Sequence, residues 1–170
     1  MARHVALLRA VNVGGTGKLP MTELKRMGEE AGFTAVRTYI ASGNLLFRSE
    51  AGEEAVRAAL EQRLAAYAGK PVAVYIRTAE ALAALVARNP FSHGAPNRVV
   101  AILLDGAPPA DALTRVIGRQ DEEIVAGERE LFVHYGDGMA RSRLRIPAAD
   151  HGTARNMNTL AKLAELAAAL

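Results

Sequence analysis

Residues 35–47 read AVRTYIASGNLLF, and this stretch decides the predicted fold. The β-branched and aromatic residues at 35–40 predict a strand, and residues 45–47 predict a second one. Between them, Ser42-Gly43-Asn44 is typical of a tight turn. The stretch therefore predicts a β-hairpin, and the segments on either side of it decide what kind of unit the hairpin belongs to.

Those flanking segments complete a βαββαβ order. Residues 4–13 are β-rich, the glycines at 14–17 break the pattern, and Pro20 opens a helical stretch that ends before Gly32. After the hairpin, residues 53–67 have helical spacing, and residues 72–76 read as a strand. Residues 1–78 are thus predicted to form a ferredoxin-like unit, an antiparallel sheet with helices packed on one face.

Residues 79–170 predict a second, looser unit of the same type. A connecting helix at 79–87 precedes a strand at 99–104, a helix at 109–117 and a hairpin of 123–126 with 130–135. A last helix is expected after Thr153, and no final strand is visible. We therefore predict an α+β fold of two ferredoxin-like units in tandem, 1–78 and 79–170, packed as one compact body. One larger mixed sheet is the alternative.

Composition limits the class of protein. At 170 residues, half of them apolar and 23% charged, the chain can bury a real core. It has no cysteine, which excludes disulfides and thiolate metal sites and indicates a reducing compartment, so we expect a cytoplasmic protein. The N-terminus resembles neither a signal peptide nor a membrane span, and no membrane partner is expected.

The positive charge lies in the first half of the chain. Residues 1–78 hold 11 basic and 7 acidic side chains, whereas residues 79–170 hold 10 and 11, which accounts for the net charge of +3. An anionic partner is therefore expected to meet the first half.

The first candidate binding segment is the glycine loop between the first strand and the first helix. Backbone N–H groups in such a loop can face an anion, and the following helix dipole adds attraction. The spacing is not that of a Walker A loop, because Asn12 stands where that motif has its first glycine. Glycines that serve turn geometry alone are the alternative. Its candidate ligand residues are Arg9, Asn12, Gly14, Gly15 and Lys18.

The second candidate is the hairpin at 37–44, which is dense in side-chain donors. Strand alternation predicts that Arg37 and Tyr39 share one face, and arginine suits bidentate recognition of carboxylate or phosphate. A solvated strand face with an Asx-type turn is the alternative. Its candidate ligand residues are Arg37, Tyr39, Ser42, Gly43 and Asn44.

The third candidate is the start of the last helix, with Thr153 as the expected N-cap. Helical spacing predicts one polar stripe that contains Arg155, Asn158 and Thr159, and these are its candidate ligand residues. The same spacing places Asn156 in the apolar stripe, where it is expected to be buried and hydrogen-bonded.

No catalytic apparatus is visible. The histidines at 4, 93, 134 and 151 are scattered without HExxH or HxH spacing, and Ser42 lacks a GxSxG frame. We therefore predict no metal ligand and name no catalytic residue. Whether the protein is an enzyme, which cofactor it uses and its oligomeric state all remain open at this stage.

Four ordered motifs resemble the bacterial family known as domain of unknown function 1697 (DUF1697). They are LLRAVNVGG at 7–15, RTYIASGN at 37–44, NPF at 89–91 and TARNMNT at 153–159, and together they span nearly the whole chain. The resemblance implies a pair of ferredoxin-like units and implies no substrate.

The leading hypothesis is that the three candidate segments form one cleft that binds an anionic small molecule bearing a phosphate or a nucleotide. A nucleic-acid-binding module is a weaker alternative, because ferredoxin-like sheets can stack bases but the aromatic signature of an RRM is absent. A structural or interaction protein, in which the polar motifs bond to one another, is the third candidate.

Overall fold

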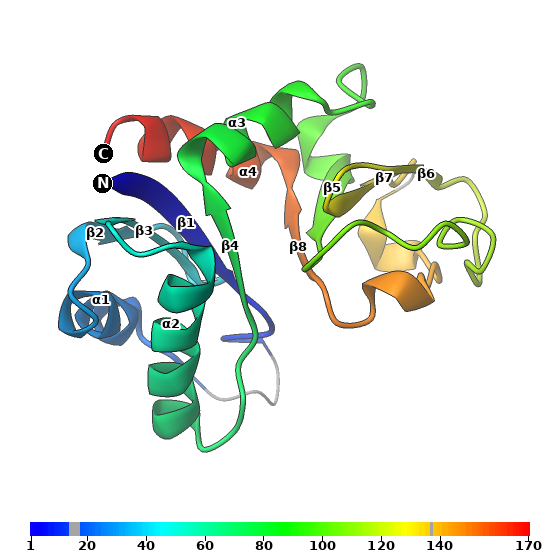
Figure 1. Cartoon of the computed structure of the whole chain (residues 1–170). Helices are drawn as coiled ribbons and strands as arrows, with labels where there is room; N and C mark the ends of the chain where they lie inside the picture. Colours follow the sequence, from blue (N-terminus) through cyan, green and yellow to red (C-terminus); the bar gives the residue numbers. More distant parts are fainter. Residues whose placement is uncertain (14–17, 137) are drawn as a thin grey trace. The chain divides into compact units, whose positions relative to one another are not determined.

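The structure, a computed structural model, describes residues 1–13, 18–136 and 138–170. In this part the chain forms two antiparallel four-stranded sheets together with α-helices (Figure 1). The first half contains β1 (Ala2–Leu8), α1 (Met21–Glu30), β2 (Thr34–Thr38), β3 (Asn44–Ser49), α2 (Glu53–Ala68), β4 (Val74–Thr78) and α3 (Ala79–Ala87). The second contains β5 (Val99–Leu103), β6 (Glu123–Ala126), β7 (Glu130–His134), β8 (Thr153–Asn156), α4 (Met157–Ala168) and three short 3-10 turns.

The chain divides into two compact units. The first comprises Met1–Ala84 and Lys162–Leu170, and the second comprises Leu85–Ala161. Both divisions fall within helices, since α3 and α4 each begin in one unit and end in the other. The second structural unit therefore begins later and ends earlier than the expected range of 79–170, and the first unit includes the residues on both sides of it.

The first sheet has the strand order β2-β3-β1-β4. Strand β1 pairs antiparallel with β3 on one side and with β4 on the other, and β2 pairs antiparallel with β3. Helices α1 and α2 lie side by side on one face of this sheet (Figure 1). The predicted strands and helices of this half are thus confirmed in kind and in order.

The core of the first unit lies between the sheet and these two helices. Alternate strand residues such as Ala6, Leu45 and Ile76 point toward the helices, whose apolar faces they meet. On the helices the buried residues include Leu24 of α1 and Leu60 of α2. The opposite face of the sheet is also buried, and the C-terminal residues are tied to it by Arg3, which donates to the Ala168 carbonyl at 2.7 Å.

Local signals in the sequence set the ends of the helices. Pro20 occupies the N-cap of α1, and Gly32, with φ of 88°, follows its end. Helix α2 ends at Gly69, which has φ of 72° and donates its N–H to the Ala65 carbonyl. The hairpin strand β2 is shorter than predicted and ends at Thr38.

The second sheet has the order β6-β7-β5-β8, again with antiparallel pairing throughout. The predicted strand at 99–104 and the hairpin that turns at Gly127-Glu128 are confirmed. The core on one face of this sheet includes Leu104, Ile124, Leu131, Val133 and Ile146. Irregular segments, rather than α-helices, pack against it.

The prediction of a helix at 109–117 is wrong. This segment forms turns, and Leu113 and Ile117 of its apolar pattern are exposed. Ile117 instead forms an isolated antiparallel bridge with Arg145, in which the backbone N–H of each residue donates to the carbonyl of the other at 2.8 Å. Backbone pairing with a segment distant in sequence has therefore overridden a short local helical pattern.

The start of the last helix was also predicted wrongly. Residues 153–156 form β8, which pairs with β5, so the final strand that the sequence did not reveal does exist. Helix α4 begins at Met157, and the Asn156 Oδ1 accepts the Thr159 N–H at 2.9 Å, so Asn156 serves as the cap in place of Thr153. Asn156 is half-buried, and Arg155 lies on a strand, outside the polar stripe of α4.

Among the described residues, no helix has the length and hydropathy that a bilayer crossing requires.

Candidate functional site

Two of the three predicted segments meet within the first unit. The N–H of Leu8, at the end of β1, donates to the Gly43 carbonyl at 2.9 Å. The side-chain amide of Asn12 donates to the Ala41 carbonyl, also at 2.9 Å. The loop after β1 and the turn before β3 are therefore one connected structure.

Asn12 holds the loop together. Its Nδ2 donates to the Leu19 carbonyl at 2.9 Å as well as to Ala41, and its Oδ1 accepts the Leu19 N–H at 2.6 Å. The residue has φ of 55°, a left-handed conformation that asparagine tolerates better than most residues. These bonds occupy both ends of the side-chain amide, so the role of Asn12 is to shape the loop.

Gly43 is required where the two segments approach each other. Its φ is 93°, and a Cβ at this position would lie 2.6 Å from Val11 Cγ2. The next residue, Asn44, is completely buried, and its Nδ2 donates to the Tyr39 carbonyl at 2.9 Å and to Ser42 Oγ at 3.1 Å. Gly43, Ser42 and Asn44 therefore build the turn itself.

Tyr39 also takes part in that turn, because its N–H donates to the Asn44 carbonyl at 3.1 Å, and the other described candidate residues of this unit lie apart from it. Arg37 is exposed on the edge strand β2 opposite Leu46, which places it on the sheet face away from α1 and α2. Tyr39 is half-buried just beyond the strand, and Arg9 is half-buried where the chain leaves β1. Gly14 and Gly15 lie outside the described residues.

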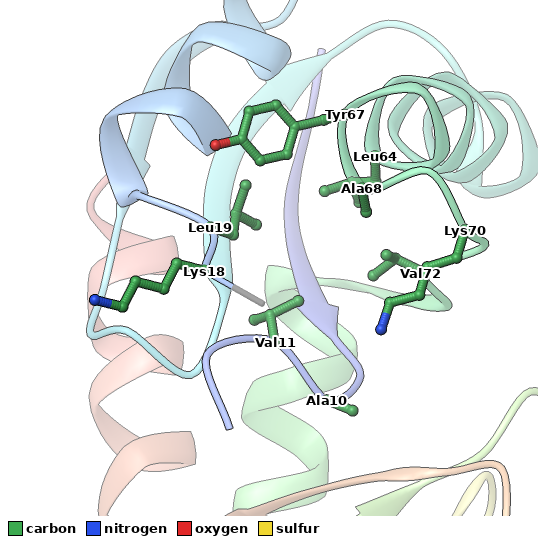
Figure 2. A pocket seen from close by; sticks show the side chains of 9 residues that line it. All are labelled: Ala10, Val11, Lys18, Leu19, Leu64, Tyr67, Ala68, Lys70 and Val72. Atoms are coloured by element: carbon green, nitrogen blue, oxygen red, sulfur yellow. The ribbon is translucent and has the colours of Figure 1, made fainter. Parts of the chain in front are cut away.

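A pocket of about 200 Å³ opens beside the loop, on the helix-covered side of the sheet (Figure 2). Buried Val11, Leu19 and Leu64 contribute apolar surface to it. The loop residues come from either side of the glycines, and the rest come from the end of α2 and the chain that follows it. The complete lining is Ala10, Val11, Lys18, Leu19, Leu64, Tyr67, Ala68, Lys70 and Val72.

The polar groups of this pocket are two lysines and a phenol. Lys18 and Lys70 lie on opposite sides of the pocket, the Lys18 side chain extends outward from it, and the ring of Tyr67 lies near Leu19 (Figure 2). Both lysines are exposed, and within residues 1–13, 18–136 and 138–170 neither ammonium group forms an ion pair. The pocket therefore combines an apolar floor with two lining lysines that have no ion-pair partner in the described residues.

The third predicted segment belongs to the second unit. Arg155 is 8% exposed, and its Nη1 donates to Thr153 Oγ1 at 2.7 Å and to the Ala154 carbonyl at 2.9 Å. Burial lowers the pKa of Arg155 to about 10, which still leaves it charged at neutral pH. Asn158 is exposed in the first turn of α4, and Thr159 is half-buried with its N–H bonded to Asn156.

Sequence reasoning named Lys18 but missed Tyr67 and Lys70. Both follow from the position of Gly69, because a helix that ends there presents its last-turn side chains and the next basic residue near the same point in space. The sequence could not show that this helix end lies beside the loop after β1, since the two are roughly fifty positions apart along the chain.

The fold and the site together define an α+β protein with two antiparallel four-stranded sheets and a small basic pocket in the first unit. Residues 1–132 match the family described as "Protein of unknown function (DUF1697)", and the chain belongs to that family. No functionally curated protein matches the sequence.

A solved structure supports the fold over the full length. The chain is similar to the conserved bacterial protein SP0830 from Streptococcus pneumoniae, with a TM-score of 0.78 and 21% sequence identity. The match covers 98% of this chain and 98% of that one. At this identity the likeness establishes a shared fold.

Proposed function

We propose that the first unit binds an anionic small molecule, bearing a phosphate or a nucleotide, in the pocket lined by Lys18, Tyr67 and Lys70. The observation that carries this proposal is that two lysines without ion-pair partners in the described residues line a largely apolar pocket. A ligand anion would supply the negative charge that pairs with these ammonium groups.

The chemistry of the lining favours a ligand with two parts. Val11, Leu19 and Leu64 offer an apolar surface to a ring or a short chain. Lys18 and Lys70 carry compact ammonium groups. Each can bind a phosphate as a point charge, whereas an arginine would bind it through two parallel hydrogen bonds. The phenol of Tyr67, which is 46% exposed, can donate a hydrogen bond or offer its ring face to a planar group.

This proposal is narrower than a cleft made of all three predicted segments. Asn12, Gly43 and Asn44 support the pocket indirectly, because they hold the loop whose residues line it. Arg37 lies on the other face of the sheet and does not take part. The residues Arg155, Asn158 and Thr159 are not needed for the proposed contacts.

The fold of each unit is proposed to be ferredoxin-like, in tandem. The strand order of the first sheet, with α1 and α2 as crossovers on one face, supports this for the first unit. The second sheet repeats the strand order with turns and 3-10 segments in place of the two helices. The absence of cysteine supports a cytoplasmic location for the protein.

A structural role for the polar motifs is the second candidate function. It is favoured by the hydrogen bonds of Asn12 and Asn44, whose side chains bond within the protein. Nucleic-acid binding by the first sheet is disfavoured, because Val5, Leu7 and Leu46 on its face away from α1 and α2 are fully buried and unavailable for base stacking.

The test is a thermal-shift screen against nucleotides, sugar phosphates, coenzymes and inorganic anions. A ligand at a hundred times its dissociation constant should stabilise the protein by about 2.7 kcal/mol. The variants are Lys18→Ala and Lys70→Ala, and the matched control is Lys25→Ala, which removes an exposed lysine from α1 outside the pocket.

A compound that raises the melting temperature of the wild type and of Lys25→Ala, but not of Lys70→Ala, supports the pocket. A shift that Arg37→Ala alone abolishes would move the ligand to the other sheet face and contradict the proposal. No shift with any compound, together with strong destabilisation by Asn44→Ala, would favour the structural role.

A further inference from the structure

The NPF motif at 89–91 builds a tight turn in the second unit. Asn89 Oδ1 accepts the N–H of Phe91 at 3.0 Å, and the N–H of Gly94 donates to the Phe91 carbonyl at 2.9 Å. Phe91 is 4% exposed and anchors the turn. The turn thereby holds the exposed His93 at a defined place on the surface.

Two further polar side chains face one another on the hairpin of β6 and β7. Glu123 and His134 are directly opposite in the antiparallel register, so both project from the same face of the sheet. The His134 Nδ1 lies 3.3 Å from Glu123 Oε1. Strand pairing, rather than loop conformation, fixes this separation.

The His134 ring is held in place from the side of the turn. The ring of Phe91 packs against it with centroids 5.5 Å apart and planes inclined by 32°. A Cβ on Gly94 would lie 2.8 Å from His134 Nε2, so the turn backbone approaches the imidazole as closely as only glycine allows. Packing of this kind restricts the rotamers of a side chain and prepares it to act as a ligand.

His93 completes the group from the turn. Its ring meets that of His134 edge to face, with centroids 5.8 Å apart and planes at 86°. One ligand atom from each of His93, Glu123 and His134 lies within 4.8 Å of the other two. Two imidazoles and a carboxylate thus converge from the turn at 89–94 and from the two strands of the hairpin.

We propose that His93, Glu123 and His134 form a binding site for a divalent transition-metal ion that prefers imidazole, with Zn²⁺ as the representative ion. Ligand bonds of about 2.0 to 2.2 Å in a tetrahedral site place neighbouring donor atoms roughly 3.3 to 3.6 Å apart. The Glu123 to His134 separation of 3.3 Å matches this spacing. His93 is exposed and can rotate to close the remaining distance.

The donor set also selects the class of ion. Imidazole nitrogen suits Zn²⁺, Cu²⁺ and Ni²⁺, whereas Mg²⁺ and Ca²⁺ prefer all-oxygen sites. Three protein donors leave at least one coordination position for water or for a ligand atom. A bound ion would link the turn at 89–94 to the hairpin, and the inference is independent of the pocket proposed in the first unit.

The test is a calorimetric titration of the full chain, free of any histidine tag and treated with a chelator, with ZnCl₂. We expect one equivalent to bind to the wild type, and His93→Ala and Glu123→Gln each to weaken binding tenfold or more. His151→Ala, which removes an exposed histidine elsewhere in the second unit, is the matched control and should bind as the wild type does. His93→Ala removes a surface side chain from a turn, so the variant should fold, and circular dichroism checks that it does.

A Co²⁺ titration gives a second readout, because a bound ion with imidazole ligands absorbs visible light. The absorption should appear in the wild type and vanish in His93→Ala. Zn²⁺ binding that is unchanged in both His93→Ala and Glu123→Gln, binding lost equally in His151→Ala, or no binding at millimolar Zn²⁺ would overturn the proposal. Mg²⁺ that binds as tightly as Zn²⁺ would overturn the assignment of ion class.

Discussion

The first and second sheets share one strand order, yet the segments that connect their strands differ in regularity. In the first unit, α1 and α2 cover one face and bury Leu24, Leu60 and Leu64 completely or nearly so. In the second unit, turns and 3-10 segments cover the corresponding core, and several of its apolar residues, such as Val116 and Leu144, are only partly buried. The two sheets thus share a strand order but are covered by different kinds of structure.

Buried carboxylates form hydrogen bonds in the second unit. The carboxylate of Glu130 is 2% exposed and accepts hydrogen bonds from Arg88 at 2.7 Å and from the Arg129 N–H at 2.9 Å. Buried Glu122 accepts from the Gln120 N–H at 2.8 Å and from Ser142 Oγ at 3.2 Å. Where no α-helix covers a face of a sheet, irregular segments can cover it, and hydrogen bonds to buried carboxylates can hold these segments in place.

The largest expected effect tests the helical cover. Leu60→Ala removes a fully buried side chain from α2 and should lower the free energy of unfolding by about 3 to 5 kcal/mol. Leu144→Ala, in the irregular cover of the second unit, should cost only about 1 to 2 kcal/mol, because this residue is half-buried. Urea unfolding of the two variants measures the difference, and equal losses would show that the two covers are energetically alike.

A smaller effect is expected from the buried carboxylate. Arg88→Met removes the charged partner of Glu130 and should cost about 2 to 3 kcal/mol, because a buried carboxylate is left with fewer donors. The control is Glu128→Gln, since Glu128 is 76% exposed in its side chain and lies 3.8 Å from Arg88. That change should alter stability by less than about 0.5 kcal/mol. Thermal unfolding measures the stability of both variants. If Arg88→Met changed stability as little as Glu128→Gln does, the proposed role of the Arg88–Glu130 pair would be refuted.

Gly43→Ala tests the contact that shapes the loop of the first unit. The added methyl group would meet Val11 Cγ2 at 2.6 Å in a left-handed backbone conformation, and we expect a loss of about 1 to 3 kcal/mol. Gly106→Ala is the control, because no atom lies within 4 Å of its Cβ position. Stability by chemical denaturation should separate the two, and a neutral Gly43→Ala would mean that the loop and the turn are not tightly joined.

The smallest effect concerns pH and is expected in the first unit. His4 is 2% exposed and stacks on Phe47, and burial lowers its pKa, with smaller opposing contributions from the Ala51 backbone and from Glu53 and Glu80. As the pH falls below 6.5, the unfolded chain therefore takes up a proton at His4 more readily than the folded chain does. The free energy of unfolding should fall as the pH falls through this range, by at most about 1.4 kcal/mol per pH unit from this group.

His4→Leu provides the comparison for that pH dependence. If the account holds, unfolding curves of the variant between pH 7 and pH 5 will show a weaker decline than those of the wild type. Parallel declines in the two proteins would assign the acid sensitivity to other groups.

The sequence predicted the first unit better than the second for a physical reason. Helices α1 and α2 carry their own end signals, Pro20 and Gly69, and apolar residues at helical spacing, so local information was sufficient. The segment at 109–117 has a helical pattern but is paired through Ile117 to Arg145, a contact that only the folded chain creates. Strand β8 was missed because four residues before a helix carry no strand periodicity of their own.

The candidate sites show the same limit. The sequence marks Asn12, Gly43 and Asn44 as unusual, and in the structure Asn12 bonds across to the Ala41 carbonyl, whereas Gly43 and Asn44 shape the turn itself. The sequence does not mark Tyr67 and Lys70 as candidate ligand residues, because their role depends on the loop after β1, which is far away along the chain. His93, Glu123 and His134 likewise have no recognisable spacing, since a turn and a hairpin register bring them together.

The most direct test of the proposed anion pocket is a two-dimensional amide NMR titration of the full chain with the best compound from the thermal-shift screen. The account predicts that the largest shift changes fall on Val11, Leu19, Leu64, Tyr67 and Lys70, and that Lys70→Ala abolishes them. Changes that cluster instead around Arg37, or within residues 85–161, would contradict it.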